Sequence, residues 1–215
     1  MFTQRKNVMF SEKNKKLGEK IMNESSNPSA IRSKQEITEA MLRLMETESY
    51  NDITVKQIVL EAGVVRKTFY RNFDSKEDLL DAIINSVMDD YIKELFYTSY
   101  KSVPEVLVKF CISHKRVIQL LDKNNLMYLV VNKINEYILR RHKEIELSGM
   151  VPDTFFKGLD VKYIIMFNVG AIWNVVCAWV HGGMKDDPKE IVETLTIYLA
   201  RIGQYAEKTM KNKGK

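Results

Sequence analysis

The sequence predicts an all-helical protein. Four prolines and nine glycines punctuate its 215 residues, so long helices are permitted and a fold rich in strands and turns is disfavoured. Apolar residues recur at helical spacing, as in the stripe of Ile37, Ala40, Met41 and Leu44. No run alternates strictly between apolar and polar residues, as a half-buried strand would.

The composition indicates a folded, soluble and basic protein. Hydrophobic residues make up 45% and charged residues 28%, and the net charge is +5. This balance permits nucleic-acid binding without establishing it. Cys111 and Cys177 lie far apart in apolar contexts, so we expect no disulfide framework, no metal site and no other cofactor. Arg5 and Lys6 are not followed by an apolar stretch with a cleavage site, which argues against a secretory signal and for the cytoplasm.

Residues 1–29 are expected to form a flexible tail. Lysines are frequent in this segment, and residues 23–29, NESSNPS, read as a linker. Two interpretations stay open: a solvated extension, or a basic arm that adds phosphate contacts.

Local signals then predict four helices in order. The first runs from Ser33, as N-cap of a capping box with Glu36, to about Thr47. The second starts at the N-cap Thr54 and ends at Gly63, since glycine tolerates the left-handed backbone of a tight turn. The third covers about 65–72, with Phe69 and Phe73 facing the core. Ser75 caps the fourth, with Asp78 as the acid of its capping box.

Every later segment also reads as helical. Pro104 opens one helix, residues 124–125 break another, and a further helix covers about 127–146 before a loop at 148–157. Asp160 caps an apolar helix that extends to residue 180. Asp187, followed by proline and by Glu190, starts the last helix, which ends near residue 211.

The uncharged segment 163–180 has nearly the length of a membrane span. Asn168 and Asn174 interrupt it, and a helix buried in a dimer interface would have the same composition. Because no second candidate span lies nearby, we expect a dimer helix and no membrane association.

A helix, a glycine-centred turn and a second short helix form the pattern of a helix-turn-helix. Between residues 54 and 73 the basic residues are Lys56, Arg66, Lys67 and Arg71, against one acid, Glu61. By spacing alone, a helical corner with a solvated basic face explains this pattern as well as DNA binding does.

Residues 54–79, TVKQIVLEAGVVRKTFYRNFDSKEDL, resemble the signature of the TetR family of transcriptional regulators. The matches are Thr54, Ile58, Ala62, Gly63, Val64, Thr68, Tyr70, Phe73, Lys76 and Leu79. The resemblance covers about 30–80 and implies a three-helix DNA-binding domain there. It also implies a helical effector-binding and dimerisation domain over residues 81–212. Two residues depart from the family pattern: Val65, where Ser or Thr is frequent, and Val59, where Ala is usual.

The resemblance also implies the residues that contact DNA: Thr54, Arg66, Lys67, Thr68, Tyr70, Arg71, Asn72 and Lys76. Their chemistry agrees, because Arg66 and Lys67 can donate to guanine and Asn72 can pair with adenine. The hydroxyl groups and Lys76 suit phosphate oxygens.

Residues 163–199 are similar to the subgroup that contains regulators of dihydroxyacetone-kinase operons, which implies the fold and the dimer role. Expected dimer residues are Gly170, Trp173, Ala178 and Trp179, with intramolecular core as the alternative. An effector pocket between helices would be lined by aromatic and other large residues, with plain core as the alternative: Phe110, His114, Met127, Tyr128, Tyr137 and Phe167.

The sequence therefore predicts a ligand-responsive repressor that acts as a homodimer on a palindromic DNA operator. The alternative is an activator or co-activator of the same fold that a partner protein controls. An enzyme is not expected, because no glycine-rich phosphate loop, nucleophile elbow or metal-spaced histidine cluster is present.

Overall fold

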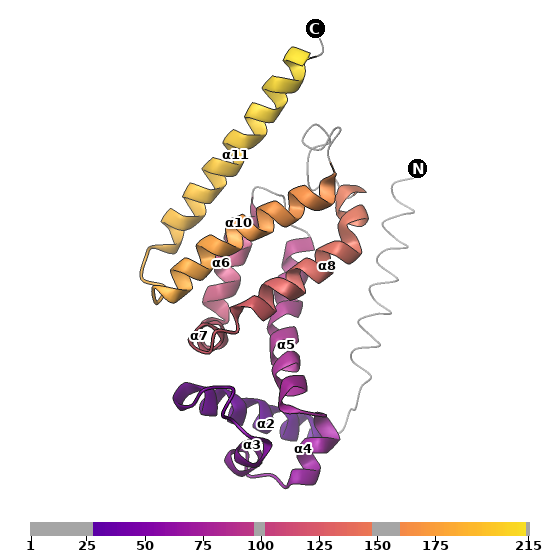
Figure 1. Cartoon of the computed structure of the whole chain (residues 1–215), viewed down its shortest axis with the longest axis vertical. Coiled ribbons are helices and arrows are strands. Elements are labelled where there is room, and N and C mark those ends of the chain that lie inside the picture. Colours follow the sequence, from indigo (N-terminus) through magenta and orange to yellow (C-terminus); the bar gives the residue numbers. More distant parts are fainter. Residues whose placement is uncertain (1–27, 97–101, 148–159, 214–215) are drawn as a thin grey trace. The chain divides into compact units, whose positions relative to one another are not determined.

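The computed structural model describes residues 28–96, 102–147 and 160–213 (Figure 1). All regular elements in these ranges are helices, which confirms the all-α prediction. The chain divides into two compact units, residues 1–79 and 80–215, and the boundary falls within one helix. The predicted tail up to residue 27 and the predicted loop at 148–157 lie outside the described residues.

The first unit contains α2 (Pro28–Thr47), α3 (Val55–Glu61), α4 (Arg66–Asn72) and the first turn of α5 (Lys76–Phe96). Helices α3 and α4 pack on α2 and on each other. Their shared core consists of fully buried side chains: Ile37, Met41, Met45, Ile58 and Phe69. The predicted stripe on α2 holds for its first three residues, whereas Leu44 is half-buried.

The start of α2 differs from the prediction, although its end at Thr47 agrees. The helix begins at Pro28, whose fixed φ suits a first helical position. Ser33 is therefore inside the helix and does not cap it, and its Oγ donates to the carbonyl of Ser29 at 2.8 Å. The capping-box pattern misled the prediction, because a serine followed three residues later by a glutamate also occurs inside helices.

The other caps of the first unit follow the local chemistry. Thr54 Oγ accepts from the backbone nitrogen of Gln57, whose side chain accepts from the backbone of Thr54 in return. Ser75 Oγ accepts from the backbone of Asp78 at 3.1 Å, as predicted. The carboxylate of Asp78, however, accepts from the backbone nitrogen of Asp74, one residue before the predicted partner.

The second unit contains the rest of α5 and five further described helices: α6 (Val103–Ser113), α7 (Lys115–Lys123), α8 (Met127–Leu147), α10 (Val161–His181) and α11 (Pro188–Lys213). Helix α10 packs against α7 and α8, and α11 packs against α6. The predicted caps are confirmed, since Asp160 and Asp187 each accept a hydrogen bond from a backbone nitrogen of the first turn. The break between α7 and α8 contains Asn125 in the left-handed region, with φ 58°.

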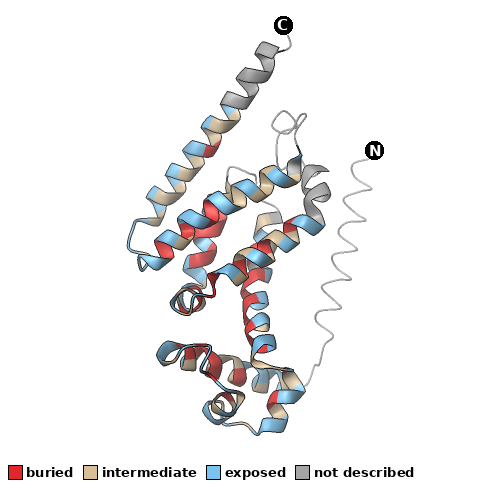
Figure 2. Ribbon diagram, in the orientation of Figure 1, coloured by how far each residue is buried: buried red, intermediate tan, exposed pale blue. Residues whose placement is uncertain are grey.

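Burial along the last two helices is incomplete (Figure 2). Among the described side chains of α11, Leu199 is the buried one. The segment Lys162–His181 of α10 has the length and composition of a membrane span, and 28% of its most apolar window is buried within the chain. The rest of this apolar window is half-buried or exposed in the described part of the chain.

Candidate nucleic-acid interface

The turn between α3 and α4 is closed by backbone hydrogen bonds around Gly63. This glycine has φ 65°, as the sequence predicted for the end of α3. The backbone nitrogen of Val64 donates to the carbonyl of Val59 at 3.0 Å. Helix α4 then begins at Arg66, after Val65 as an N-cap residue whose side chain makes no capping hydrogen bond.

Two phenylalanines determine which face of α4 points to solvent. Phe69 is fully buried and Phe73 nearly so, and their ring centres are 5.9 Å apart. Their prediction as core residues is confirmed. Because successive residues of a helix are about 100° apart, burying Phe69 leaves positions 67, 70 and 71 on the outer side, and position 66, about 60° from Phe69, borders that side. All four are exposed.

The outer face of α4, defined by Arg66, Lys67, Tyr70 and Arg71, is cationic. The sequence of α4, RKTFYRN, contains no acid. The guanidinium of Arg66 lies 5.5 Å from the centre of the Tyr70 ring and donates to its hydroxyl at 3.2 Å. This contact holds two of the predicted DNA-contacting residues together on the surface.

Thr54, Thr68 and Asn72 are partly used inside the chain. The Thr54 hydroxyl both caps α3 and donates to the side chain of Gln57 at 2.7 Å. The amide nitrogen of Asn72 donates to the carbonyl of Thr68 at 2.7 Å, and both residues are half-buried. One of the two N–H donors of the Asn72 amide is thus used inside the helix.

Lys76 has an internal role that the sequence did not predict. Its ammonium donates to the carbonyls of Tyr50, Asn51 and Ile53 at 2.8, 3.0 and 2.8 Å. An ammonium carries three N–H donors, so all are used inside the first unit. These contacts tie the start of α5 to the segment that precedes α3.

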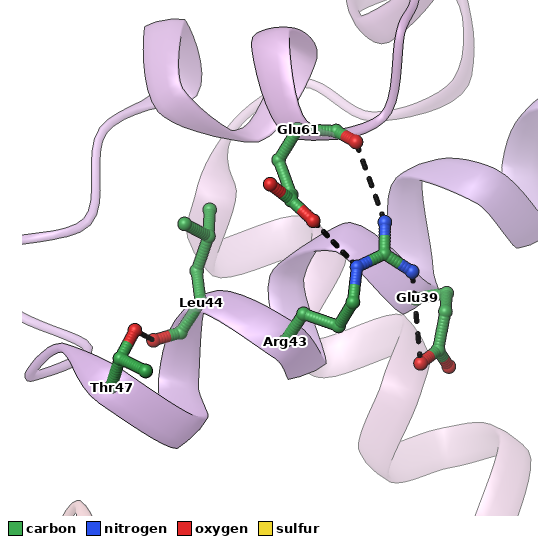
Figure 3. A network of polar contacts seen from close by, with 5 residues as sticks. All are labelled: Glu39, Arg43, Leu44, Thr47 and Glu61. Carbon is green, nitrogen blue, oxygen red and sulfur yellow. Dashed lines mark hydrogen bonds and ion pairs between the residues drawn. The ribbon is translucent and has the colours of Figure 1, made fainter.

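A second residue that sequence reasoning missed is Arg43 on α2 (Figure 3). Its Nε donates to the carboxylate of Glu61, the last residue of α3, and a terminal nitrogen donates to the Glu61 carbonyl at 3.4 Å. The other terminal nitrogen lies 3.9 Å from Glu39. Arg43 thus holds α3 against α2 just before the turn, and it balances the one acid between residues 54 and 73.

The six predicted pocket residues differ in burial: two are buried, two are half-buried and two are exposed. Phe110 and Met127 are buried, and Phe110 packs against the ring of Tyr91. Tyr128 and Phe167 are instead 55% and 73% exposed. Side chains this exposed do not line an enclosed pocket within one chain. His114 and Tyr137 are half-buried.

A groove of about 710 Å³ lies between α6 and α11. Its apolar lining includes Val108, Ile112, Val192 and Ile197, and its polar lining includes Lys109. None of the predicted pocket residues borders it. The sequence could not indicate this groove, because it forms only where two helices distant in the sequence meet.

The four predicted dimer residues fall into two groups. Trp173 and Trp179 are buried within the chain, and the indole nitrogen of Trp179 donates to the carbonyl of Asp186 at 3.1 Å. They therefore serve the intramolecular core, which was the alternative interpretation. Gly170 and Ala178 are exposed, and a Cβ added at Gly170 would meet nothing within 4 Å.

Two family models match the chain. The model of bacterial regulatory proteins of the tetR family matches residues 37–83, and a transcriptional regulator C-terminal region matches residues 114–201. Together they cover more than half of the sequence. The first match contains the whole helix-turn-helix.

Two curated relatives are helix-turn-helix-type transcriptional regulators of Staphylococcus aureus. The one from strain MRSA252 is 26% identical over 125 residues, which are 54% of this chain and 64% of the relative. The one from strain USA300 is 26% identical over 142 residues, or 60% and 74%. The match thus spans less than two thirds of the first relative.

Solved structures share the fold at lower identity. The fatty acid degradation regulator FadR from Bacillus halodurans has a TM-score of 0.54 at 18% identity, covering 82% of this chain and 96% of that one. The dihydroxyacetone kinase operon activator DhaS has a TM-score of 0.53 at 20% identity, covering 80% and 96%. A TetR-family regulator from Syntrophomonas wolfei has a TM-score of 0.61 at 15% identity, covering 81% and 94%. The chain belongs to the TetR family and is a transcriptional regulator with a DNA-binding helix-turn-helix.

Proposed function

We propose that this regulator binds a palindromic operator as a homodimer, with α4 of each protomer in the major groove. The observation that carries the proposal is the cationic outer face of α4, which the buried Phe69 turns to solvent. Its arginines and lysine match guanine edges and phosphates in charge and reach. The proposed contact residues are Thr54, Arg66, Lys67, Thr68, Tyr70, Arg71 and Asn72, without Lys76.

The exposed apolar side of α10 supports the homodimer. Tyr163, Phe167, Gly170, Asn174 and Ala178 recur every three or four residues and are all exposed. Such spacing places them on one side of the helix. A 20-residue apolar segment that is 28% buried over its most apolar window leaves apolar surface for lipid or another protein to cover. In a DNA-binding regulator of the cytoplasm, α10 of a second protomer provides that surface. The small residues Gly170 and Ala178 allow the two helices to approach closely.

A ligand can regulate such a dimer by changing the distance between its two DNA-binding domains. The two copies of α4 must lie about 34–36 Å apart to meet successive major grooves. A small molecule that favours another spacing shifts the population away from DNA, which makes the protein a repressor released by its ligand. The groove between α6 and α11, of about 710 Å³, is large enough for such a molecule.

The opposite sign of regulation is the second candidate. One protein of similar fold is the dihydroxyacetone kinase operon activator DhaS, so the fold is compatible with activation controlled by a partner protein. Transcript levels after deletion of the gene separate the two. Target transcripts rise when a repressor is lost and fall when an activator is lost.

The test of the DNA interface uses Tyr70→Ala and Arg71→Ala. Each variant should lose most operator binding in a gel-shift assay while the oligomeric state and helical content stay those of the wild type. Lys115→Ala is the matched control, because Lys115 is an exposed basic residue of the second unit. Wild-type operator binding by both α4 variants would show that α4 is not the DNA-contacting element.

A further inference from the structure

Val65 is an apolar residue that contributes little to folding. It directly precedes α4, and its side chain is 69% exposed. Its carbonyl accepts from the backbone nitrogen of Thr68 at 2.8 Å, but its side chain makes no capping hydrogen bond. A serine, threonine, aspartate or asparagine would cap the helix here and stabilise it. The valine therefore needs an explanation other than the stability of α4.

The neighbours of Val65 make its exposure more specific. The side chains that follow it, Arg66 and Lys67, are exposed and cationic, and Tyr70 is exposed one turn later. An isolated exposed apolar residue is ordinary on a protein surface. Here it borders the outer face of α4, which we have proposed to enter the major groove. Docking that face on DNA brings Val65 to the edges of the bases or close to them.

One apolar group stands on the base edges of the major groove, namely the C5-methyl group of thymine. We infer that Val65 packs against the methyl group of a thymine in each operator half-site and so determines sequence preference at that position. A valine side chain has no donor for phosphates and no donor or acceptor for the polar base edges. This inference rests on the proposed function, because it requires α4 to lie in the groove.

Uracil substitution tests the contact, because it removes the C5-methyl group and leaves base pairing unchanged. The full chain is first used to select and footprint its operator. Each thymine of one half-site is then replaced by uracil in turn. Wild-type affinity should fall about fourfold at one thymine, which corresponds to one methyl group buried from water. For Val65→Ala, uracil at that thymine should change the affinity by less than twofold.

Two further variants separate recognition from stability. Val65→Ser should raise the melting temperature, since its hydroxyl can cap α4, and should still lose the response to uracil. Leu60→Ala is the matched control, because Leu60 is the exposed apolar residue of α3, at 79%. It should keep the wild-type response at the thymine assigned to Val65.

Equal responses to uracil in the wild type and in Val65→Ala at every thymine would overturn the inference and leave the proposed function intact. Failure of the selection to yield any sequence-specific duplex would overturn the proposed function and this inference together. The inference about Val65 would also be overturned if no replacement of thymine by uracil in the half-site changed the affinity of the wild type.

Discussion

The ammonium of Lys76 lies 4.6 Å from the centre of the Tyr50 ring and donates to the carbonyl of that same residue at 2.8 Å. Two more carbonyls of the segment before α3 complete its hydrogen bonds. The start of α5 is thereby tied to the segment that leads into the helix-turn-helix. The ammonium that the resemblance assigns to a phosphate contact makes these hydrogen bonds within the domain.

Lys76→Met should lower the free energy of unfolding by about 2–3 kcal/mol, since three charge-assisted hydrogen bonds are lost from partly buried carbonyls. Urea denaturation of the full chain measures this. Lys56→Met, at an exposed lysine of α3, should change stability by less than about 0.5 kcal/mol. A phosphate contact predicts the reverse for Lys76: unchanged stability and a salt dependence of DNA binding that is weaker by about one unit of slope.

The ion pair between Arg43 and Glu61 should contribute modestly to both stability and DNA binding. Both side chains are about 40% exposed, so a double-mutant cycle should give a coupling of about 0.5–1 kcal/mol. Arg43→Ala leaves the Glu61 carboxylate uncompensated beside the turn and should weaken operator binding about two- to threefold at low salt. Adding Glu61→Gln to that variant should restore the affinity. A double variant as weak as Arg43→Ala alone would show that Arg43 acts by some route other than its charge.

Stability should fall in alkaline solution because of buried acids in the second unit. Burial, with a smaller contribution from Cys177, raises the pKa of the Cys111 thiol to about 12 from its ordinary 9.0. Burial likewise raises the pKa of Tyr91, which packs on Phe110. Both groups stay protonated in the folded state where the unfolded chain already ionises. Their contribution to the free energy of unfolding is complete below about pH 9. It is lost as pH rises towards 12, by up to about 1.4 kcal/mol per pH unit for each group.

Urea unfolding between pH 8 and pH 10.5 tests the titration. The slope should be shallower in Cys111→Ala than in the wild type, whereas Cys177→Ala should keep most of it, because Cys177 is half-buried. In the folded wild type a thiol reagent should modify Cys177 slowly and leave Cys111 unmodified until the chain unfolds. Rapid modification of Cys111 in the folded protein would contradict its burial.

Phe167→Glu should convert the dimer to a monomer. A carboxylate on the exposed apolar side of α10 would be buried without a partner at the proposed interface, which costs several kcal/mol. Sedimentation velocity measures the mass, and operator affinity should fall because one protomer reads one half-site. Tyr128→Glu is the control, at another exposed aromatic residue, on α8. A Phe167→Glu protein that stays dimeric would remove α10 from the interface.

Much of the fold was predictable because its signals are local. Thr54, Asp160 and Asp187 accept from nitrogens two or three residues away, and Gly63 needs nothing beyond its own φ. Where a local signal was ambiguous, as at Ser33, the helix begins earlier, at Pro28. The burial of Phe69 and Phe73 was also predictable, since their spacing of four residues puts them on one face.

The sequence by itself determined the helices, most of their caps and the cationic face of α4, because neighbours along the chain create all of these. Only the tertiary structure decided that Lys76 ties two segments 23–26 residues apart and that Arg43 reaches Glu61 across 18. It also decided that Trp173 is core while Phe167 faces solvent, on one and the same apolar helix. Such outcomes depend on which face of a helix meets another helix, and a periodic apolar pattern does not name that neighbour.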